Sequence, residues 1–154
     1  MAKKRSAIRM TDEELWPFIE AGKSLQVATL NRDGSPHLTT LWFAVVDGAI
    51  VFETFSKSQK IVNLKRDPRI SVLIETGESY NELRGATLSG TAELVEDPEK
   101  VHTLAFAVMR KMNPQVPAAA LEGMARQMAK KRTAVIVRPT KIVSWDHRKL
   151  AGAY

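Results

Sequence analysis

Two Asp-Gly pairs set between short apolar, β-branched segments constrain the fold of this chain more than any other feature. Asp33-Gly34 lies within a polar stretch of turn-forming residues, and Asp47-Gly48 directly separates two apolar runs. Asp-Gly accommodates the positive φ angles of tight hairpin turns, so each pair predicts a reversal of the chain. The segments around these turns are predicted to be strands: 24–30, 37–46 and 49–55. Together they predict an antiparallel meander.

A helix is predicted to precede the first strand. Thr11 and Glu14 form a capping box, in which each side chain can satisfy a backbone N–H group of the first turn. Apolar residues follow at helical spacing, and Gly22 is a typical left-handed terminator. We therefore expect a helix from Thr11 to near Gly22.

The remainder of the chain is predicted to mix helices with further antiparallel strands. Helices are expected at 58–67, 97–111 and 118–130, and strands at 69–75, 83–95 and 134–145. Gly85 and Gly90 suggest bulges or bends, and Pro139 indicates an edge or a bulge in the last strand. Because neighbouring strands are joined locally, the fold class is predicted to be α+β, an antiparallel β-barrel with flanking helices.

Length and composition indicate one globular domain. The chain has 154 residues, of which 44% are hydrophobic and 26% charged, as in typical folded domains. It has no cysteine, which excludes disulfides, thiolate nucleophiles and cysteine-ligated metal clusters. No apolar run approaches a membrane span, and the basic N-terminus lacks the apolar segment of a signal peptide. We therefore expect a cytoplasmic protein.

Positive charge is concentrated at the two ends of the chain. The net charge is +6, but residues 1–10 carry +4, residues 110–154 carry +8 and the middle of the chain carries −6. The acidic middle and the lack of a strand motif that mixes aromatic and basic residues argue against nucleic-acid binding. We predict a basic tail at 1–10 and a single domain at 11–154.

Familiar catalytic motifs are missing. His37, His102 and His147 are far apart, and none has a second ligand at metal-binding spacing. The chain has no Gly-x-Ser-x-Gly elbow, no Gly-x-Gly-x-x-Gly sequence and no Walker loop. The sequence therefore predicts neither a metal centre nor standard hydrolytic chemistry.

The segment from Thr54 to Asn63 carries the clearest binding chemistry. A strand ends here and a helix begins with Lys57, Ser58 and Lys60 clustered at its positive end. Two ammonium groups, a hydroxyl and free backbone N–H groups can together hold a phosphate. The alternative, weighed equally on this pattern, is that a serine caps the helix and the lysines point into water.

Five stretches in this order resemble the split β-barrel proteins related to pyridoxamine 5′-phosphate oxidase, over roughly residues 10–150: 27–37, 54–63, 63–73, 85–94 and 143–148. More narrowly, the chain resembles the B-type flavin/deazaflavin oxidoreductases, many of which use the deazaflavin coenzyme F420 and others FMN. The resemblance implies a homodimer with the cofactor in a groove between protomers. It also implies that Lys57, Ser58 and Lys60 hold the cofactor phosphate, with Thr54 and Asn63 flanking them.

Four further residues are weighed on the same resemblance. Trp42 is either a core aromatic of the barrel or a wall of the ring site. Arg84 is either a solvated charge at a strand end or a cofactor ligand, since relatives carry a basic residue near this position. Trp145 and His147 either pack at the dimer interface or reach the cofactor of the other protomer.

The function implied by the resemblance is hydride transfer. We expect an F420-dependent reductase that passes a hydride from the reduced coenzyme to an electron-poor acceptor such as an enone, a quinone or an unsaturated lactone, with the chemistry supplied by the cofactor. Alternatives are an FMN-dependent oxidoreductase and a non-catalytic flavin or deazaflavin carrier. Vitamin B6 oxidation is disfavoured, because Gln59-Lys60 replaces two adjacent basic residues of the oxidase pattern.

Overall fold

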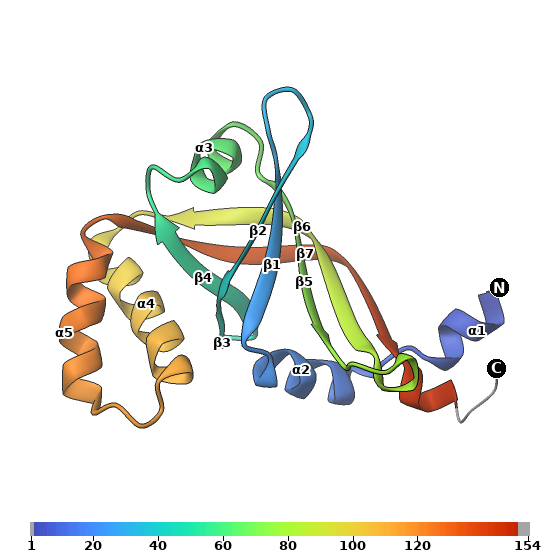
Figure 1. Ribbon diagram of the computed structural model, residues 1–154. Coiled ribbons are helices and arrows are strands. Elements are labelled where there is room, and N and C mark those ends of the chain that lie inside the picture. Colours follow the sequence, from blue (N-terminus) through green and yellow to red (C-terminus); the bar gives the residue numbers. More distant parts are fainter. Residues whose placement is uncertain (1, 151–154) are drawn as a thin grey trace.

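One antiparallel sheet, curled into a half-barrel, forms the centre of the molecule (Figure 1). The computed structural model describes residues 2–150, with side chains from Arg5 onward. The sheet has the strand order β2-β1-β5-β6-β7-β4-β3, and every neighbouring pair is antiparallel. The strands are β1 (Ser24–Leu30), β2 (Pro36–Trp42), β3 (Ala44–Val46), β4 (Ala49–Phe55), β5 (Arg69–Thr76), β6 (Arg84–Val95) and β7 (Arg132–Asp146). The predicted fold class is confirmed.

Helices surround the sheet on several sides. In Figure 1, α2 runs below the sheet, α3 sits above it beside the β1–β2 tip, and α4 and α5 stand together at the left. The helices are α1 (Ala2–Ala7), α2 (Asp12–Ala21), α3 (Gln59–Arg66), α4 (Pro98–Met112) and α5 (Ala118–Ala129), with 3-10 turns η1 (Tyr80–Glu82) and η2 (His147–Leu150). No helix in the described part of the chain is long and apolar enough to cross a membrane.

The predicted strand 37–46 is divided at Phe43. Phe43 is fully buried, β2 before it pairs with β1, and β3 after it pairs with β4 at the opposite edge of the sheet. The expected three-strand meander is therefore wrong, because the two hairpins do not pair with each other. The Asp47-Gly48 turn itself is confirmed, with φ of 50° and 75° at its two residues.

The long β6–β7 pair carries the bulge that curls the sheet. Ser89 pairs with Lys141 and Gly90 with Pro139, so Thr140 is the extra residue in β7. A Cβ on Gly90 would lie 2.1 Å from the carbonyl oxygen of Arg138, which explains the glycine. Pro139 thus lies at a bulge in an interior strand, one of the two predicted positions.

The start of α2 follows the predicted capping box, because the Glu14 carboxylate accepts a hydrogen bond of 2.8 Å from the Thr11 N–H group. The helix ends at Gly22, but the predicted left-handed conformation is wrong, since its φ is −64°. A Cβ at Gly22 would lie 2.8 Å from Ile74 Cγ2, so close packing is what requires glycine there.

Three apolar clusters hold the fold together. The largest fills the concave face of the sheet and takes in the buried residues of α2, among them Phe18 and Ile19. A second lies between α4 and the β3–β4 side of the sheet, and a third lies between α4 and α5. The main cluster also includes Ile61 and Leu64 of α3, so α2 and α3 both pack against it.

The segment before α2 is tied to the end of β7. The carbonyl of Ile8 accepts a hydrogen bond of 2.7 Å from the Asp146 N–H group, and the Met10 N–H group donates to Ser144 Oγ at 3.1 Å. Met10 is buried in the main cluster. The side chains of Lys3 and Lys4, part of the basic tail expected at 1–10, lie outside the described residues.

Candidate functional site

The turn from β4 into α3 forms the centre of the candidate site. β4 ends at Phe55, and the Ser58 N–H group donates to the Phe55 carbonyl at 2.9 Å, which turns the chain into the helix. Ser58 is the N-cap residue with extended backbone, so the first N–H groups of α3 have no partner within the helix. The helix start therefore offers unpaired donors to a ligand.

Ser58 does not cap the helix with its side chain. Its Oγ atom makes no capping hydrogen bond, and it is buried without any hydrogen-bond partner. Ser56 does not cap it either, since its hydroxyl pairs with Thr133 Oγ1 at 2.9 Å. The capping alternative considered for these serines is therefore wrong. Because buried polar atoms in native proteins are nearly always hydrogen-bonded, the Ser58 hydroxyl is a position at which a ligand atom is expected.

Two lysines lie within two residues of Ser58 in the sequence. Lys57 is exposed, whereas Lys60 is half-buried, and burial lowers the pKa of its ammonium group. No ion pair of the described residues involves either lysine. A half-buried ammonium without a counterion is electrostatically costly, and an anionic ligand would relieve that cost.

Asn63 anchors α3 to β1. Its side chain is 0% exposed, donates to Thr29 Oγ1 at 3.1 Å and to Asn31 Oδ1 at 3.0 Å, and accepts from Gln59 Nε2 at 2.9 Å. Its donors and its acceptor are thus occupied within the protein. Asn63 therefore positions the start of α3 instead of offering free atoms to a ligand.

Thr54 has a comparable supporting place. It is buried near the end of β4, where it pairs with Thr133 of β7. Behind it, Arg132 forms an ion pair of 2.8 Å with Glu53 and stacks over the Phe55 ring at 4.3 Å. Thr54 thus lies in the frame that holds the turn.

Trp42 and Arg84 lie far from this cluster within the chain. Asn63 contacts Thr29, whereas Trp42 pairs with Ser24, about 17 Å away along β1. Trp42 is also 54% exposed, so its interpretation as a core aromatic is wrong. Arg84 begins β6 at the opposite end of the barrel, where its guanidinium lies 5.3 Å from the Phe18 ring centre.

Trp145 and His147 also belong to the opposite end. The Trp145 indole lies over Gly85, and His147 Nδ1 is 2.8 Å from the Tyr80 carbonyl oxygen. Both line a cavity of about 630 Å³ between α1 and β7, together with Arg5 and Arg9. The structure thus divides the predicted site residues between two ends of the barrel.

One part of the site was not found from the sequence. An open cavity of about 610 Å³ beside the start of α3 is lined by Asn31, Arg32, Asp33, His37 and Gln59. His37 was considered only as a metal ligand. The sequence pattern that could have revealed it is the alternation of side chains along the strand after Pro36. This alternation places the polar residues His37 and Thr39 on the inner face of the sheet.

The arrangement is suited to binding an anion. No group of three or more His, Asp or Glu side chains in the described part of the chain is placed to hold a metal ion. The α3 start, by contrast, combines a free hydroxyl, two ammonium groups and helix N–H donors. These are the groups that bind a phosphate.

Comparison with known proteins places the chain among split-barrel proteins. A family model described as pyridoxamine 5′-phosphate oxidase matches residues 11–146. A solved structure of a conserved hypothetical protein from Mycobacterium tuberculosis is 42% identical, with a TM-score of 0.90, over 96% of this chain and 91% of that chain. An F420 reductase is 23% identical (TM-score 0.62; 82% of this chain, 93% of that chain), and an FAD-binding protein from Mesorhizobium loti is 16% identical (TM-score 0.64; 88% and 94%). No curated protein matches the chain.

Proposed function

The chain belongs to the pyridoxamine 5′-phosphate oxidase family, and on that premise we propose that it is an oxidoreductase that holds a flavin or deazaflavin by its phosphate. The proposed cofactor is F420, with FMN as the alternative. The proposed reaction is hydride transfer from the reduced coenzyme to an electron-poor acceptor such as an enone, a quinone or an unsaturated lactone. The proposed location is the cytoplasm.

The observation that carries this proposal is the unpartnered hydroxyl of Ser58 at the start of α3. A phosphate oxygen there would accept from the hydroxyl and from the N–H groups of the first turn. The Lys60 ammonium, whose pKa is lowered by burial, would regain a counterion. The residues present thus fit a phosphate group, which flavin and deazaflavin coenzymes carry.

Each residue then has a defined task. Ser58, Lys57 and Lys60 bind the phosphate, and Asn63 keeps the helix start in place through Thr29 and Asn31. When bound, the deazaflavin supplies the hydride. The protein contributes orientation and exclusion of water, and effective molarities set an upper limit of about 7–11 kcal/mol for orientation.

We further propose a homodimer that completes the site. The outer face of the sheet exposes Leu38 (69%), Trp42 (54%) and Val143 (47%), a set of large apolar side chains that pairing would cover. Such a dimer would bring Trp145 and His147 of one protomer towards the phosphate site of the other. Sedimentation equilibrium tests this, and a 17.1 kDa species across micromolar concentrations would contradict it.

Binding and turnover experiments test the cofactor. The protein is titrated separately with F420, FMN and riboflavin, and the absorption spectrum of protein purified from a host that makes both coenzymes identifies what it retains. We expect F420 to bind, and riboflavin, which has no phosphate, to bind weakly. Tighter binding of FMN than of F420 would make FMN the assigned cofactor. Binding of neither coenzyme would refute the proposal.

Turnover distinguishes an enzyme from a carrier. Reduced F420 is mixed anaerobically with a panel of enones and quinones, with and without the protein. Faster coenzyme oxidation with the protein present supports the reductase, whereas tight binding without acceleration supports the carrier. Removal of one side chain far from the phosphate cluster should not abolish turnover. If such a removal did abolish turnover, the missing side chain would be a catalytic acid.

A further inference from the structure

Unpartnered polar atoms extend from α3 onto strand β2. Among the described residues, His37 Nδ1 and Thr39 Oγ1 are buried without a hydrogen-bond partner, as is Ser58 Oγ. His37 and Thr39 are alternate residues of β2 and therefore share one face, about 7 Å apart. An unmade hydrogen bond at a buried atom is unfavourable, so several such atoms in one region indicate a ligand that completes them.

The sheet register places His37 beside the start of α3. His37 pairs with Thr29 across the β1–β2 ladder, and Thr29 Oγ1 accepts the hydrogen bond from Asn63 that anchors α3. His37 and Gln59, the first residue of α3, line the same open cavity of about 610 Å³. Thr29 thus pairs with His37 through the backbone and contacts α3 through its side chain, which places His37 next to the helix start.

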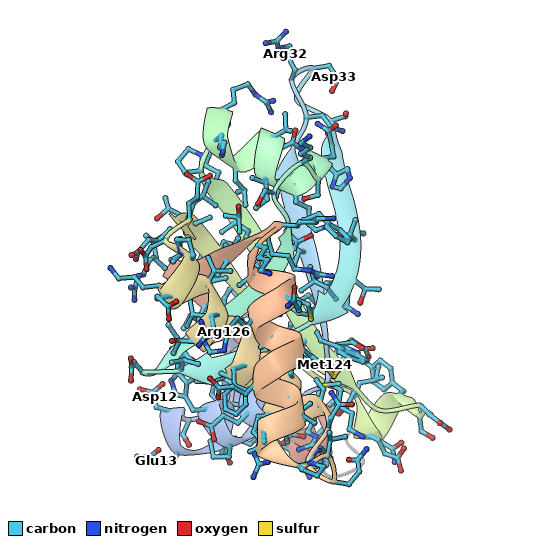
Figure 2. All side chains as sticks on the ribbon, turned by 90° about the vertical axis from the view of Figure 1, so that its left-hand side faces the viewer. Asp12, Glu13, Arg32, Asp33, Met124 and Arg126 are labelled. Carbon is cyan, nitrogen blue, oxygen red and sulfur yellow. The ribbon has the colours of Figure 1, made fainter. Side chains whose placement is uncertain are left out.

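The charged groups around His37 favour an anion. From the β1–β2 turn come Arg32 and Asp33, which Figure 2 shows at the tip of the hairpin, beyond the barrel. The Asp33 carboxylate already accepts from the Ser35 N–H group at 2.9 Å and from the Ser35 hydroxyl. Lys57 and Lys60 lie at the start of α3, whose first residue, Gln59, lines the same cavity as His37.

Arg66, at the far end of α3, donates to the Leu30 carbonyl and is thereby engaged in the fold. Of the charged residues that line the cavity, Arg32 is the cation and Asp33 is the acid, whose carboxylate is already hydrogen-bonded. An imidazole in such surroundings lacks a protein acceptor and is available to an oxygen of a ligand.

We propose that His37 contacts the anionic ligand held at the start of α3, with a ring N–H group donating to a phosphate oxygen. This inference deepens the proposed function and rests on it for the presence of a phosphate group. Thr39 offers its hydroxyl to the same ligand from the next inward position of β2.

Imidazole NMR tests the contact directly, because the chain has only three histidines. The ring signals of His37, His102 and His147 are assigned by substitution, and inorganic phosphate, FMN, F420 and riboflavin are added in turn. We expect the phosphate-bearing probes to shift the His37 ring signals and leave those of His102, which is buried between α4 and α5, unchanged. If no phosphate-bearing probe shifts His37, the inference is overturned.

The probes separate this inference from the proposed function. A shift of His37 with inorganic phosphate, without binding of FMN or F420, would support the inference and refute the flavin proposal. Binding of FMN or F420 with an unmoved His37 signal would do the reverse. Riboflavin serves as the control that carries the ring system without the phosphate.

A variant tests the contribution of the contact to binding. His37→Ala removes the ring donor, and affinities for FMN are compared between the variant and the wild type. We expect the variant to bind about tenfold more weakly, because it loses a charge-assisted hydrogen bond to the phosphate. Equal affinity of the two proteins for FMN would contradict the proposed contact.

Discussion

Both ends of the barrel carry cationic side chains, but Arg148 and Lys149 at the β7 end are paired, whereas Lys57 and Lys60 at the α3 end form no ion pair among the described residues. At the β7 end, Arg148 donates to both oxygens of Asp146, at 2.9 Å and 2.6 Å, and Lys149 donates to Glu14 at 2.5 Å. At the α3 end, Lys57 and Lys60 form no ion pair among the described residues, and Ser58 Oγ has no partner. Groups left unsatisfied by the fold are the ones available to a ligand.

Paired and unpaired cationic residues are expected to have different roles, the first in stability and the second in binding. Charges at the β7 end join the N-terminal segment, α2 and the end of the sheet, so their loss should lower stability. Lys57 and Lys60 at the α3 end form no ion pair among the described residues, so their loss should affect binding while the fold stays intact. Substitutions at the two ends separate these effects, and the following predictions run from the largest expected change to the smallest.

The largest effect is expected for Lys57→Ala combined with Lys60→Ala. Each charged hydrogen bond contributes about 1.5–3 kcal/mol, so cofactor affinity should fall by about 3 kcal/mol, roughly 100-fold. Titration with the coenzyme that the wild-type protein binds measures the affinity of the double variant, and circular dichroism checks that the variant is folded. Lys65→Ala is the matched control, since Lys65 lies on the same helix and pairs with Glu96 at 2.7 Å. Equal cofactor affinity of the double variant and the wild type would show that neither lysine contacts the cofactor.

Asn63→Ala should weaken the joint between the binding end and the sheet. The substitution leaves Thr29, Asn31 and Gln59 without their partner, so the free energy of unfolding should fall by about 2–3 kcal/mol. Urea denaturation measures the change. Asn81→Ala, at an exposed position of η1, should change stability by no more than about 0.5 kcal/mol. A similar small loss in both variants would show that Asn63 does not anchor α3.

Asp146→Asn tests the paired end. The Arg148 side chain lowers the pKa of the Asp146 carboxyl, so this pair contributes stability above the unfolded-state pKa near 3.9. That contribution is lost as the pH falls through the lower folded-state value. The variant should therefore lose about 2 kcal/mol at pH 7 and show a flatter dependence of stability on pH below about 4.

The smallest effect is a contrast in sign between two lysines. Lys60→Met should leave stability unchanged or raise it by less than about 0.5 kcal/mol, because burial lowers the pKa of Lys60 and disfavours its charged form in the folded state. Lys149→Met should lower stability, because it removes the partner of Glu14. Thermal unfolding of both variants at pH 7 measures the contrast. A loss of stability in both would mean that Lys60 also has a structural role.

Much of the fold follows from local sequence chemistry. The capping box of Thr11 and Glu14 and the positive φ angles of Asp47-Gly48 were predictable because each depends on a few adjacent residues. A bulge near Pro139 was predictable, but its exact position was not. The extra residue, Thr140, is defined by the pairing of β7 with β6. The division of strand 37–46 at Phe43 was not predictable from alternation, because both halves have strand character and the change of partner is a long-range choice.

The candidate site divides in the same way. Lys57, Ser58 and Lys60 are adjacent in the sequence and were predicted together, whereas the partners that occupy Asn63 come from β1. Trp42 reads as a core aromatic in a strand, yet it lies on the outward face, because burial is decided by which side of the sheet faces the core.

By itself, the sequence determined the turns, the helix starts and the cluster of cations and hydroxyl at Ser58, since these depend on residue types a few positions apart. The tertiary structure decided that Phe43 carries the chain between sheet edges and that His37 lies beside α3. It also decided which polar atoms remain unpartnered. Hydrogen-bond satisfaction depends on groups that are distant in the chain, and only the closed barrel brings these groups together or keeps them apart.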